Sequence, residues 1–348
     1  MRIGKHTIGL GNDPFIIAEM SGNHNQSLDR AMQIIKAAAE TGAQALKLQT
    51  YTADSITIDH RGGLFDITDK NSLWYGRNLY ELYQEASTPY EWHKPMMDYA
   101  ASLGILCFST PFDEKGVEFL EELQVPAYKI ASFENNHIPL IKKIAETGKP
   151  VIASTGVSSI SDTQLMVDTL RDNGCKEIVL LKCTSTYPAT PENTNLLTIP
   201  HMRQLFNCEV GLSDHTMGIG VGVAAVALGA TVIEKHFCLS RAEGGVDSAF
   251  SLEPAEMKAL VSETKRAQLS LGNIQYGIQN AELKSLDFKR SIYVIKDINE
   301  GENFTTENVG IIRPGDGIHP KYFEQVLGMK AKTTIYKGTP FTNKLIQQ

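Results

Sequence analysis

The feature that most limits how this chain can fold is a regular alternation of short apolar runs with amphipathic stretches. Eight apolar runs begin at residues 15, 45, 105, 127, 151, 178, 209 and 232: FIIAEM, ALKLQT, ILCFST, AYKIAS, VIAST, IVLLKCT, EVGLSDH and VIEKHF. Between them lie segments with helical spacing, and each of several ends in a glycine that can adopt the left-handed conformation. Eight strand and helix units predict an α/β protein with a closed (β/α)8 barrel, the TIM barrel; an open doubly wound sheet is the alternative.

The first helix shows the boundary signals most clearly. Its apolar positions Ala31, Ile34, Ile35 and Ala38 follow the spacing i, i+3, i+4 and i+7. Ser27 precedes it as an N-cap, and Gly42 follows it as a stop.

The pattern changes after Gly272, which predicts a second domain. Residues 1–272 are assigned to the barrel and residues 273–285 to a polar linker. Residues 286–348 combine short strand-like runs with turns and are assigned to a small second domain.

Composition excludes several classes of protein. Hydrophobic residues make up 42% and charged residues 21% of the 348, a balance typical of a soluble globular protein. No apolar run approaches the roughly 18 residues of a membrane span, and a net charge of −7 argues against nucleic-acid partners. The N-terminal residues show no secretory signal, and the five cysteines form no CxxC pair. We therefore expect a cytoplasmic protein with reduced cysteines and without a membrane or nucleic-acid partner.

One connection is much longer than the others. Residues 53–89 carry many aromatic and charged side chains, so we expect them to fold over the mouth of the barrel. The alternative is an insertion that has no contact with substrate.

Polar side chains occur at nearly every predicted strand end, where the active sites of TIM barrels lie. They are Glu19, Lys47, Gln49, Ser109, Thr110, Lys129, Ser132, Ser154, Thr155, Thr184, Ser185, Ser213, Asp214, His215, Glu234, Lys235 and His236, with Glu134 and Tyr187 just beyond. Charged groups inside a closed barrel are costly unless they have partners, so packing alone does not account for this set.

Two histidines end consecutive strands and are candidate metal ligands. His215 and His236 can present imidazole nitrogens to one divalent ion and leave positions open for substrate. Either histidine taken alone is better explained as a hydrogen-bonded residue of the rim.

A second group is typical of an anion site. Two ammonium groups and several hydroxyls supply donors for the oxygens of a phosphate or carboxylate. The residues are Lys47, Thr110, Lys129, Ser132, Ser154 and Ser213. For any single serine the alternative is a helix N-cap.

The order of these motifs resembles the sialic acid synthase family from the first strand to the C-terminus. The segments that carry the resemblance are IAEMSGNHNQSL, ALKLQTY, FSTPF, YKIASFENN, STG at 154 to 156, KCTSTYP, VGLSDHT, VIEKHF and IIRPGDGIHP. TPYEWH, KIASFE, KCTSTYP, DSAFSL and GRNLYELYQEA are most similar to the branch that makes pseudaminic acid, and less so to the branches that make N-acetylneuraminic or legionaminic acid.

The resemblance implies a TIM barrel followed by an antifreeze-like (SAF) domain, and a reaction. Phosphoenolpyruvate would condense with an open-chain 2,4-diacetamido-2,4,6-trideoxy-L-altrose to give a nine-carbon acid and phosphate. His215 and His236 would hold Mn2+, with Mg2+ or Co2+ as alternatives. The set Lys47, Thr110, Lys129, Ser132, Ser154 and Ser213 would bind phosphoenolpyruvate.

The resemblance also assigns roles around the sugar. Glu19 and Gln49 would lie beside it, Tyr187 and Asp247 would contact it further out, and Glu134 would position or deprotonate water. Arg313 of the SAF domain would reach the sugar in the partner subunit of a domain-swapped homodimer.

Two other functions compete with this interpretation. A Schiff-base aldolase or lyase could use Lys129 or Lys235 as its nucleophile, and a sugar-binding module without catalytic activity could use the second domain.

The two lysines near Glu134 are expected to lower the pKa of its carboxyl and so weaken it as a base.

Overall fold

The computed structural model describes residues 1–347, which divide into two compact units, one from Met1 to Gly272 and one from Asn273 onward. Among these residues no helix is long and apolar enough to cross a membrane. The limits assigned to the linker remain a prediction, although every residue from 273 to 285 is exposed.

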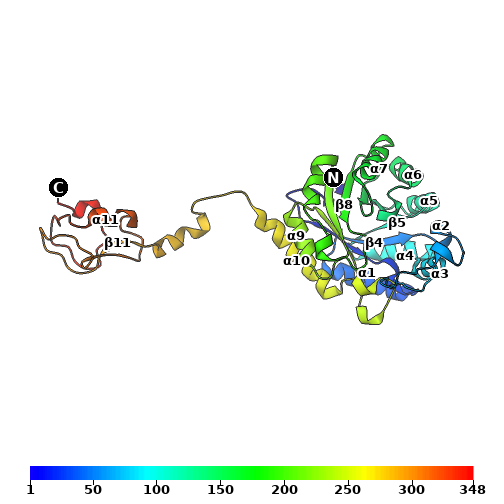
Figure 1. Ribbon diagram of the computed structural model, residues 1–348, viewed down its shortest axis with the longest axis horizontal. Helices are drawn as coiled ribbons and strands as arrows, with labels where there is room; N and C mark the ends of the chain where they lie inside the picture. Colours follow the sequence, from blue (N-terminus) through cyan, green and yellow to red (C-terminus); the bar gives the residue numbers. More distant parts are fainter. Residues whose placement is uncertain (348) are drawn as a thin grey trace. The chain divides into compact units, whose positions relative to one another are not determined.

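The first unit is a closed barrel of eight parallel strands (Figure 1). The strands are β3 (Phe15–Glu19), β4 (Ala45–Thr50), β5 (Leu106–Pro111), β6 (Tyr128–Ile130), β7 (Val151–Ser154), β8 (Ile178–Cys183), β9 (Glu209–Asp214) and β10 (Val232–His236). Each of the eight apolar runs therefore forms a strand. The barrel closes because β10 pairs with β3, with Val232 opposite Phe15, and this pairing rules out the open sheet.

Helices surround the barrel and bury an apolar stripe against it. They are α1 (Leu28–Thr41), α4 (Tyr90–Ser102), α5 (Glu114–Glu122), α6 (Ile138–Glu146), α7 (Ile160–Asp172), α8 (Thr198–Phe206), α9 (Gly220–Ala227) and α10 (Pro254–Leu271). Helix α1 begins and ends as predicted: the Ser27 hydroxyl accepts a hydrogen bond from the Arg30 amide at 3.3 Å, and Gly42 has φ +87°.

A short N-terminal hairpin is the one part of this unit that the sequence analysis did not anticipate. Strands β1 (Arg2–Ile3) and β2 (His6–Thr7) are two residues long, too short to produce an alternating pattern. Ile3 and Ile8 are buried in the main core. The Arg2 amide donates to the Glu177 carboxylate, just before β8, so the hairpin lies at the amino ends of the strands.

The long connection after β4 crosses the mouth, as predicted. It contains α2 (Ala53–Ile56), the 3-10 helix η2 (Gly63–Phe65) and α3 (Leu79–Ala86). Trp74 donates from Nε1 to the carbonyl oxygen of Val246 at 2.9 Å, and its ring centroid lies 5.8 Å from that of Tyr187. Tyr187 follows β8, which is four strands from β4 on the opposite side of the barrel.

The second unit has its own core. Strand β11 (Ser291–Val294) pairs antiparallel with β12 (Val309–Ile312), accompanied by η7 (Asn280–Phe288), η8 (Pro320–Tyr322), α11 (Phe323–Val326) and η9 (Asn343–Leu345). Its buried residues are Ile292, Val294, Ile298, Phe304, Val309, Val326, Ala331, Ile335 and Phe341.

Two fully buried histidines lie outside the barrel, near α3 and α4. His24 accepts from the Gln26 amide at Nδ1 (3.2 Å) and lies 3.1 Å from Thr88 Oγ1 at Nε2. His93 lies 3.1 Å from the Pro89 carbonyl at Nδ1 and 2.8 Å from Thr50 Oγ1 at Nε2. His24 Nδ1 accepts from an amide, so the His24 ring is neutral, and His93 Nδ1 donates to the Pro89 carbonyl oxygen, which can only accept.

We predict that these histidines make the fold sensitive to acid. Burial lowers the pKa of each to about 4, from an ordinary 6.5. Because the unfolded chain takes up the protons first, unfolding becomes easier as the pH falls from about 6.5 towards 4, by up to about 3 kcal/mol per histidine. Urea denaturation at pH 7.5 and pH 5.0 measures this difference. His93→Gln should reduce it and the exposed control His201→Gln should not; equal pH dependence in both variants would contradict the prediction.

Candidate functional site

A network of buried charges occupies the interior of the barrel at the carboxyl ends of its strands. Lys47 Nζ lies 2.9 Å from Glu19 Oε2 and 3.3 Å from Glu234 Oε1. Lys129 Nζ lies 3.7 Å from the same oxygen of Glu234 and donates to Ser154 Oγ at 2.7 Å. These four ionisable residues are each 5% exposed or less, so little water screens them. Glu234 Oε1 therefore faces both ammonium groups.

The network extends through neutral side chains. Gln49 donates to Glu19 Oε1 at 2.9 Å, and Lys47 donates to Thr110 Oγ1 at 3.3 Å. Ser213 lies 3.5 Å from Glu234 Oε1. Five of the six residues predicted to bind an anion, namely Lys47, Thr110, Lys129, Ser154 and Ser213, are thus joined by direct contacts to each other or to Glu234.

Burial and neighbouring charges shift the two lysines in opposite directions. Burial alone would lower the pKa of Lys47, but Glu19 and Glu234 outweigh it and raise the value. For Lys129 burial dominates, and the pKa is lowered despite Glu234. Burial also raises the pKa of Glu19 to about 7, in opposition to Lys47. Two carboxylates and two ammonium groups therefore balance one another in a site with little access to water.

Ser132, the sixth residue of the predicted anion set, is held beside the network by the loop after β7. Its hydroxyl accepts from the Gly156 amide at 3.1 Å. The backbone passes so close that a Cβ at Gly156 would lie 2.1 Å from Ser185 Oγ and 2.6 Å from Ser132 Oγ. Glycine is therefore required here, because any side chain would displace these hydroxyls.

The two candidate metal ligands lie together at the mouth. The ring centroids of His215 and His236 are 5.4 Å apart, and Tyr187 and Phe250 pack against both rings. His215 Nδ1 lies 3.1 Å from the Thr184 carbonyl oxygen, which can only accept, so Nδ1 donates to it and Nε2 is the nitrogen left to face a ligand. Burial lowers the pKa of His215, but Cys183 and the Thr184 carbonyl oxygen outweigh it and raise the value.

His236 is the less satisfied of the pair. Its buried Nδ1 has no hydrogen-bond partner among residues 1–347 and lies 3.8 Å from Asp247 Oδ2. Burial, followed by the charge of His215, lowers the pKa of His236 well below 6.5, so its imidazole is neutral. An unpaired neutral imidazole beside a second one suits a divalent cation. No group of three or more His, Cys, Asp and Glu side chains within the described chain is arranged to hold a metal.

Cys183 adds a thiol to this end of the site. Its Sγ lies 3.9 Å from His215 Nδ1 and 3.7 Å from Ser185 Oγ. Burial raises the pKa of the thiol, but the hydrogen bond and the charge of His215, followed by hydrogen bonds from Ser132 and Ser185, outweigh it and bring the value to about 6. The sequence analysis treated this residue only as a reduced cysteine.

Lys235 points away from the site. Successive strand side chains alternate between the two faces, so Glu234 and His236 face the interior while Lys235 faces the helices. Its ammonium group is fully buried against Asp214 at 2.7 Å. This buried ion pair on the outer face of the barrel removes Lys235 as a Schiff-base candidate, whereas Lys129 remains inside.

The prediction about the pKa of Glu134 is wrong. Burial raises this pKa to about 7, and the lysines, which lower it, have the smaller effect. Glu134 Oε2 is buried and has no hydrogen-bond partner within residues 1–347.

Of the three predicted sugar contacts, two lie at the mouth. Tyr187 packs on His215 with centroids 4.5 Å apart, and Asp247 accepts a hydrogen bond from Ser21. Arg313 belongs to the second unit, where it is exposed and forms no ion pair with any described residue. Its role remains a prediction.

Sequence reasoning gave no role to Glu234 or Trp74. Glu234 was named only among the polar residues at strand ends, although its position two residues before His236 places both on one face of the strand. Trp74 lay within the long connection, and nothing in its local sequence specified the residues that it meets.

A parallel (β/α)8 barrel with charged, metal-competent side chains at the carboxyl ends of its strands defines a TIM-barrel enzyme. The chain belongs to the NeuB family, whose model matches residues 34–276; a SAF domain matches residues 289–347. The family resemblance seen in the sequence and the SAF domain are thereby confirmed.

Three relatives illustrate the match. The pseudaminic acid synthase of Campylobacter jejuni serotype O:2 is 46% identical over 324 residues, covering 93% of this chain and 94% of its own. The pseudaminic acid synthase of Helicobacter pylori is 42% identical, with 94% and 96% covered. The crystal structure of N-acetylneuraminic acid (sialic acid) synthetase from Leptospira borgpetersenii superposes with a TM-score of 0.72 at 32% identity, covering 83% of this chain and 95% of that one.

We predict that Glu234→Gln destabilises the fold. The substitution keeps the size of the side chain but removes the charge that faces Lys47 and Lys129, and leaving a buried charge without its partner costs about 3 kcal/mol or more. Urea denaturation gives the free energy of unfolding. Glu146→Gln, an exposed carboxylate on α6, serves as the matched control and should change it by less than about 0.5 kcal/mol. Equal stability of the two variants would contradict the role given to Glu234.

Proposed function

We propose that this chain is a pseudaminic acid synthase: it condenses phosphoenolpyruvate with 2,4-diacetamido-2,4,6-trideoxy-L-altrose and water to give pseudaminic acid and phosphate. The observation that carries the proposal is the placement of two buried ammonium groups next to a pair of imidazoles at the mouth of a NeuB-family barrel. The ammonium groups suit an anionic phosphate ester, and the imidazoles suit a carbonyl-activating cation. The similarity to the Campylobacter and Helicobacter enzymes supports the choice of sugar.

Phosphoenolpyruvate binds to the interior network. Lys47 and Lys129 supply two positive charges, and the hydroxyl groups of Thr110, Ser132, Ser154 and Ser213 supply neutral donors. Since these groups are already ordered by contacts with one another, binding requires little loss of side-chain freedom. The anion takes over part of the interaction that Lys47 and Lys129 make with Glu234.

The sugar binds above the network, beside the histidines. NeuB-family synthases are generally metal-dependent. His215 and His236 would hold the cation, proposed as Mn2+ with Mg2+ or Co2+ as alternatives, and the bound cation would polarise the aldehyde oxygen. Tyr187 and Asp247 contact the sugar further out, and Glu19 and Gln49 lie beside its reacting end.

Carbon–carbon bond formation leaves positive charge on the carbon that bears the phosphate, and water adds there before phosphate departs. We assign Glu134 the role of positioning this water or taking up its proton. Its pKa of about 7 suits a base that works near neutral pH. Glu19 and Glu234 place negative charge near the developing cation, the kind of preorganised stabilisation that contributes most to catalysis.

The active form is proposed to be a domain-swapped homodimer in which Arg313 of one chain reaches an acetamido group of the sugar in the other. We place the enzyme in the cytoplasm. All five cysteines are free, which agrees with a reducing compartment.

A Schiff-base lyase that uses Lys129 is the second candidate. It is favoured by the lowered pKa of this buried amine, since a neutral amine is the nucleophile in such enzymes. The hydrogen bond from Lys129 to Ser154 and its approach to Glu234 instead suit an ammonium group that binds an anion. N-acetylneuraminic and legionaminic acid synthesis remain the alternatives within the same family.

Phosphate release from phosphoenolpyruvate, measured with a panel of amino sugars, tests the proposal. We expect release with the 2,4-diacetamido-L-altrose sugar, little release with N-acetylmannosamine or the legionaminic acid precursor, and loss of release when a chelator removes divalent metal. Equal phosphate release with and without the chelator would contradict the proposed role of the metal. Preference for another amino sugar would identify the chain as a synthase of another nine-carbon acid. Covalent trapping of pyruvate on Lys129 by borohydride would replace the proposal with the lyase.

A further inference from the structure

Trp74 is the side chain through which the connection after β4 meets the predicted sugar contacts. Its Nε1 donates to the carbonyl oxygen of Val246 at 2.9 Å, one residue before Asp247. Its ring centroid lies 5.8 Å from that of Tyr187. Asp247 and Tyr187 come from different loops, after β10 and after β8, so a single indole group borders both of the sugar contacts at the mouth.

The ring contacts indicate which part of a sugar the indole group borders. Tyr187 packs on His215 with centroids 4.5 Å apart and lies 6.5 Å from His236. Trp74 follows Tyr187 in this series of rings. An open-chain sugar whose aldehyde oxygen lies at the two histidines directs its other carbons away from them. The indole group therefore borders the region of the far end of the sugar.

The indole group offers this region a ring and no free hydrogen-bonding group. The N–H is the only polar group of a tryptophan side chain, and here it is engaged by the Val246 carbonyl oxygen. Trp74 is partly exposed, so part of the ring is accessible to a ligand. An aromatic face favours contact with methyl groups, whereas a hydroxyl group placed against it loses water without gaining a partner.

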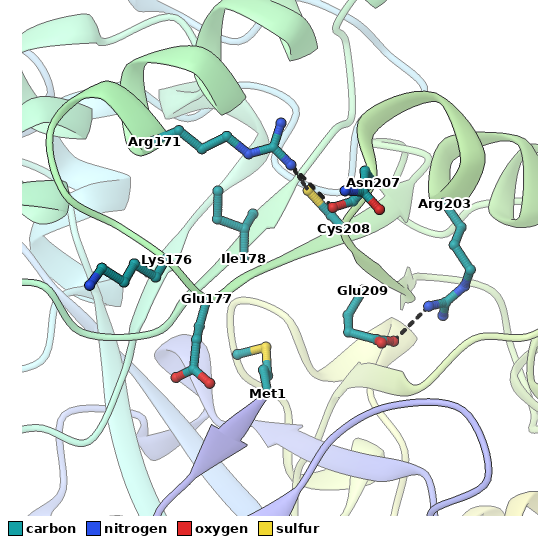
Figure 2. Close-up of a pocket in the computed structure, with 9 residues that line it drawn as sticks. All are labelled: Met1, Arg171, Lys176, Glu177, Ile178, Arg203, Asn207, Cys208 and Glu209. Carbon is teal, nitrogen blue, oxygen red and sulfur yellow. Dashed lines mark hydrogen bonds and ion pairs between the residues drawn. The ribbon is translucent and has the colours of Figure 1, made fainter.

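A recess of about 540 Å³ at the amino ends of β8 and β9 lies at the wrong end of the barrel to take part in this choice (Figure 2). Its arginines are used within the fold, since Arg203 pairs with Glu209 at 2.7 Å. Arg171 Nη2 donates to the carbonyl oxygens of Phe206 at 2.6 Å and Asn207 at 3.1 Å. Selection among sugars therefore belongs to the mouth, at the carboxyl ends of the strands.

We propose that Trp74 is a specificity-determining residue, whose indole face accepts the apolar end of a 6-deoxy, 4-acetamido sugar and disfavours a sugar with hydroxyl groups at these carbons. The inference rests on the proposed function, because 2,4-diacetamido-2,4,6-trideoxy-L-altrose presents a methyl group at carbon 6 and an acetamido methyl group at carbon 4. N-acetylmannosamine carries hydroxyl groups at both positions. An apolar contact of this size discriminates by about 10- to 100-fold.

The preference between the two sugars, measured as the ratio of their kcat/KM values, tests the proposal. Trp74→Gln keeps a donor for the Val246 oxygen but replaces the ring by an amide that can bond to hydroxyl groups, so the ratio should fall about tenfold or more. The KM for phosphoenolpyruvate should stay unchanged. Trp74→Phe, which keeps a ring but no N–H, should retain most of the preference. Tyr75→Gln, at a neighbouring aromatic residue that is 52% exposed, is the matched control and should behave as the wild type.

Fluorescence tests the contact itself without turnover. The chain has two tryptophans, Trp74 and Trp92. Reduction of the aldehyde gives a sugar alcohol that cannot condense with phosphoenolpyruvate. Titration of the wild type with the sugar alcohol of the L-altrose sugar should change the tryptophan fluorescence. Trp74→Phe should abolish this change, and Trp92→Phe should keep it.

The outcomes separate this inference from the proposed function. A wild type that prefers the L-altrose sugar, together with an unchanged preference in a folded Trp74→Gln protein, would overturn the role of Trp74 alone. A fluorescence change that persists in Trp74→Phe would do the same. A wild type that prefers N-acetylmannosamine would overturn both the choice of sugar and the role of Trp74.

Discussion

The electrostatic balance inside the barrel is the constraint on which the rest of the site depends. A lone ammonium or carboxylate group at this depth would cost several kcal/mol, and it would neutralise itself by a shift of pKa. Lys47 and Lys129 remain useful as charges because Glu19 and Glu234 lie within 2.9 to 3.7 Å of them. The same arrangement leaves the lysines ready for an anion, because a bound phosphate can take over part of the role of Glu234.

The barrel makes this balance possible through strand alternation. Residues two apart on a strand share a face, so Glu234 and His236 both point inward while Lys235 turns outward to Asp214. Glu234 therefore belongs to the site, whereas its neighbour Lys235 joins β10 to β9 beneath the helices. The connection after β4 crosses the mouth of the barrel, where the ring of Trp74 packs against that of Tyr187.

Much of this could be predicted from the sequence, because the signals are local. Eight apolar runs specified eight strands, and the Ser27 cap marked the start of a helix. What could not be predicted depends on burial and on long-range contact. The pKa of Glu134 rises because the folded protein excludes water, which outweighs the nearby lysines. The hydrogen-bond partner of Trp74 is 172 residues away in the sequence. The strands of the N-terminal hairpin are two residues long, which is too short to show an alternation of apolar and polar residues.

The central claim is that the buried ammonium groups form the receptor for phosphoenolpyruvate. The most direct measurement is the dissociation constant of phosphoenolpyruvate for Lys129→Met, compared with the wild type and with the exposed-site variant Lys142→Met. Removing one buried charge-assisted contact is expected to weaken binding at least about 100-fold, close to 3 kcal/mol, while Lys142→Met leaves it unchanged. An unaltered dissociation constant for a folded Lys129→Met protein would contradict the account.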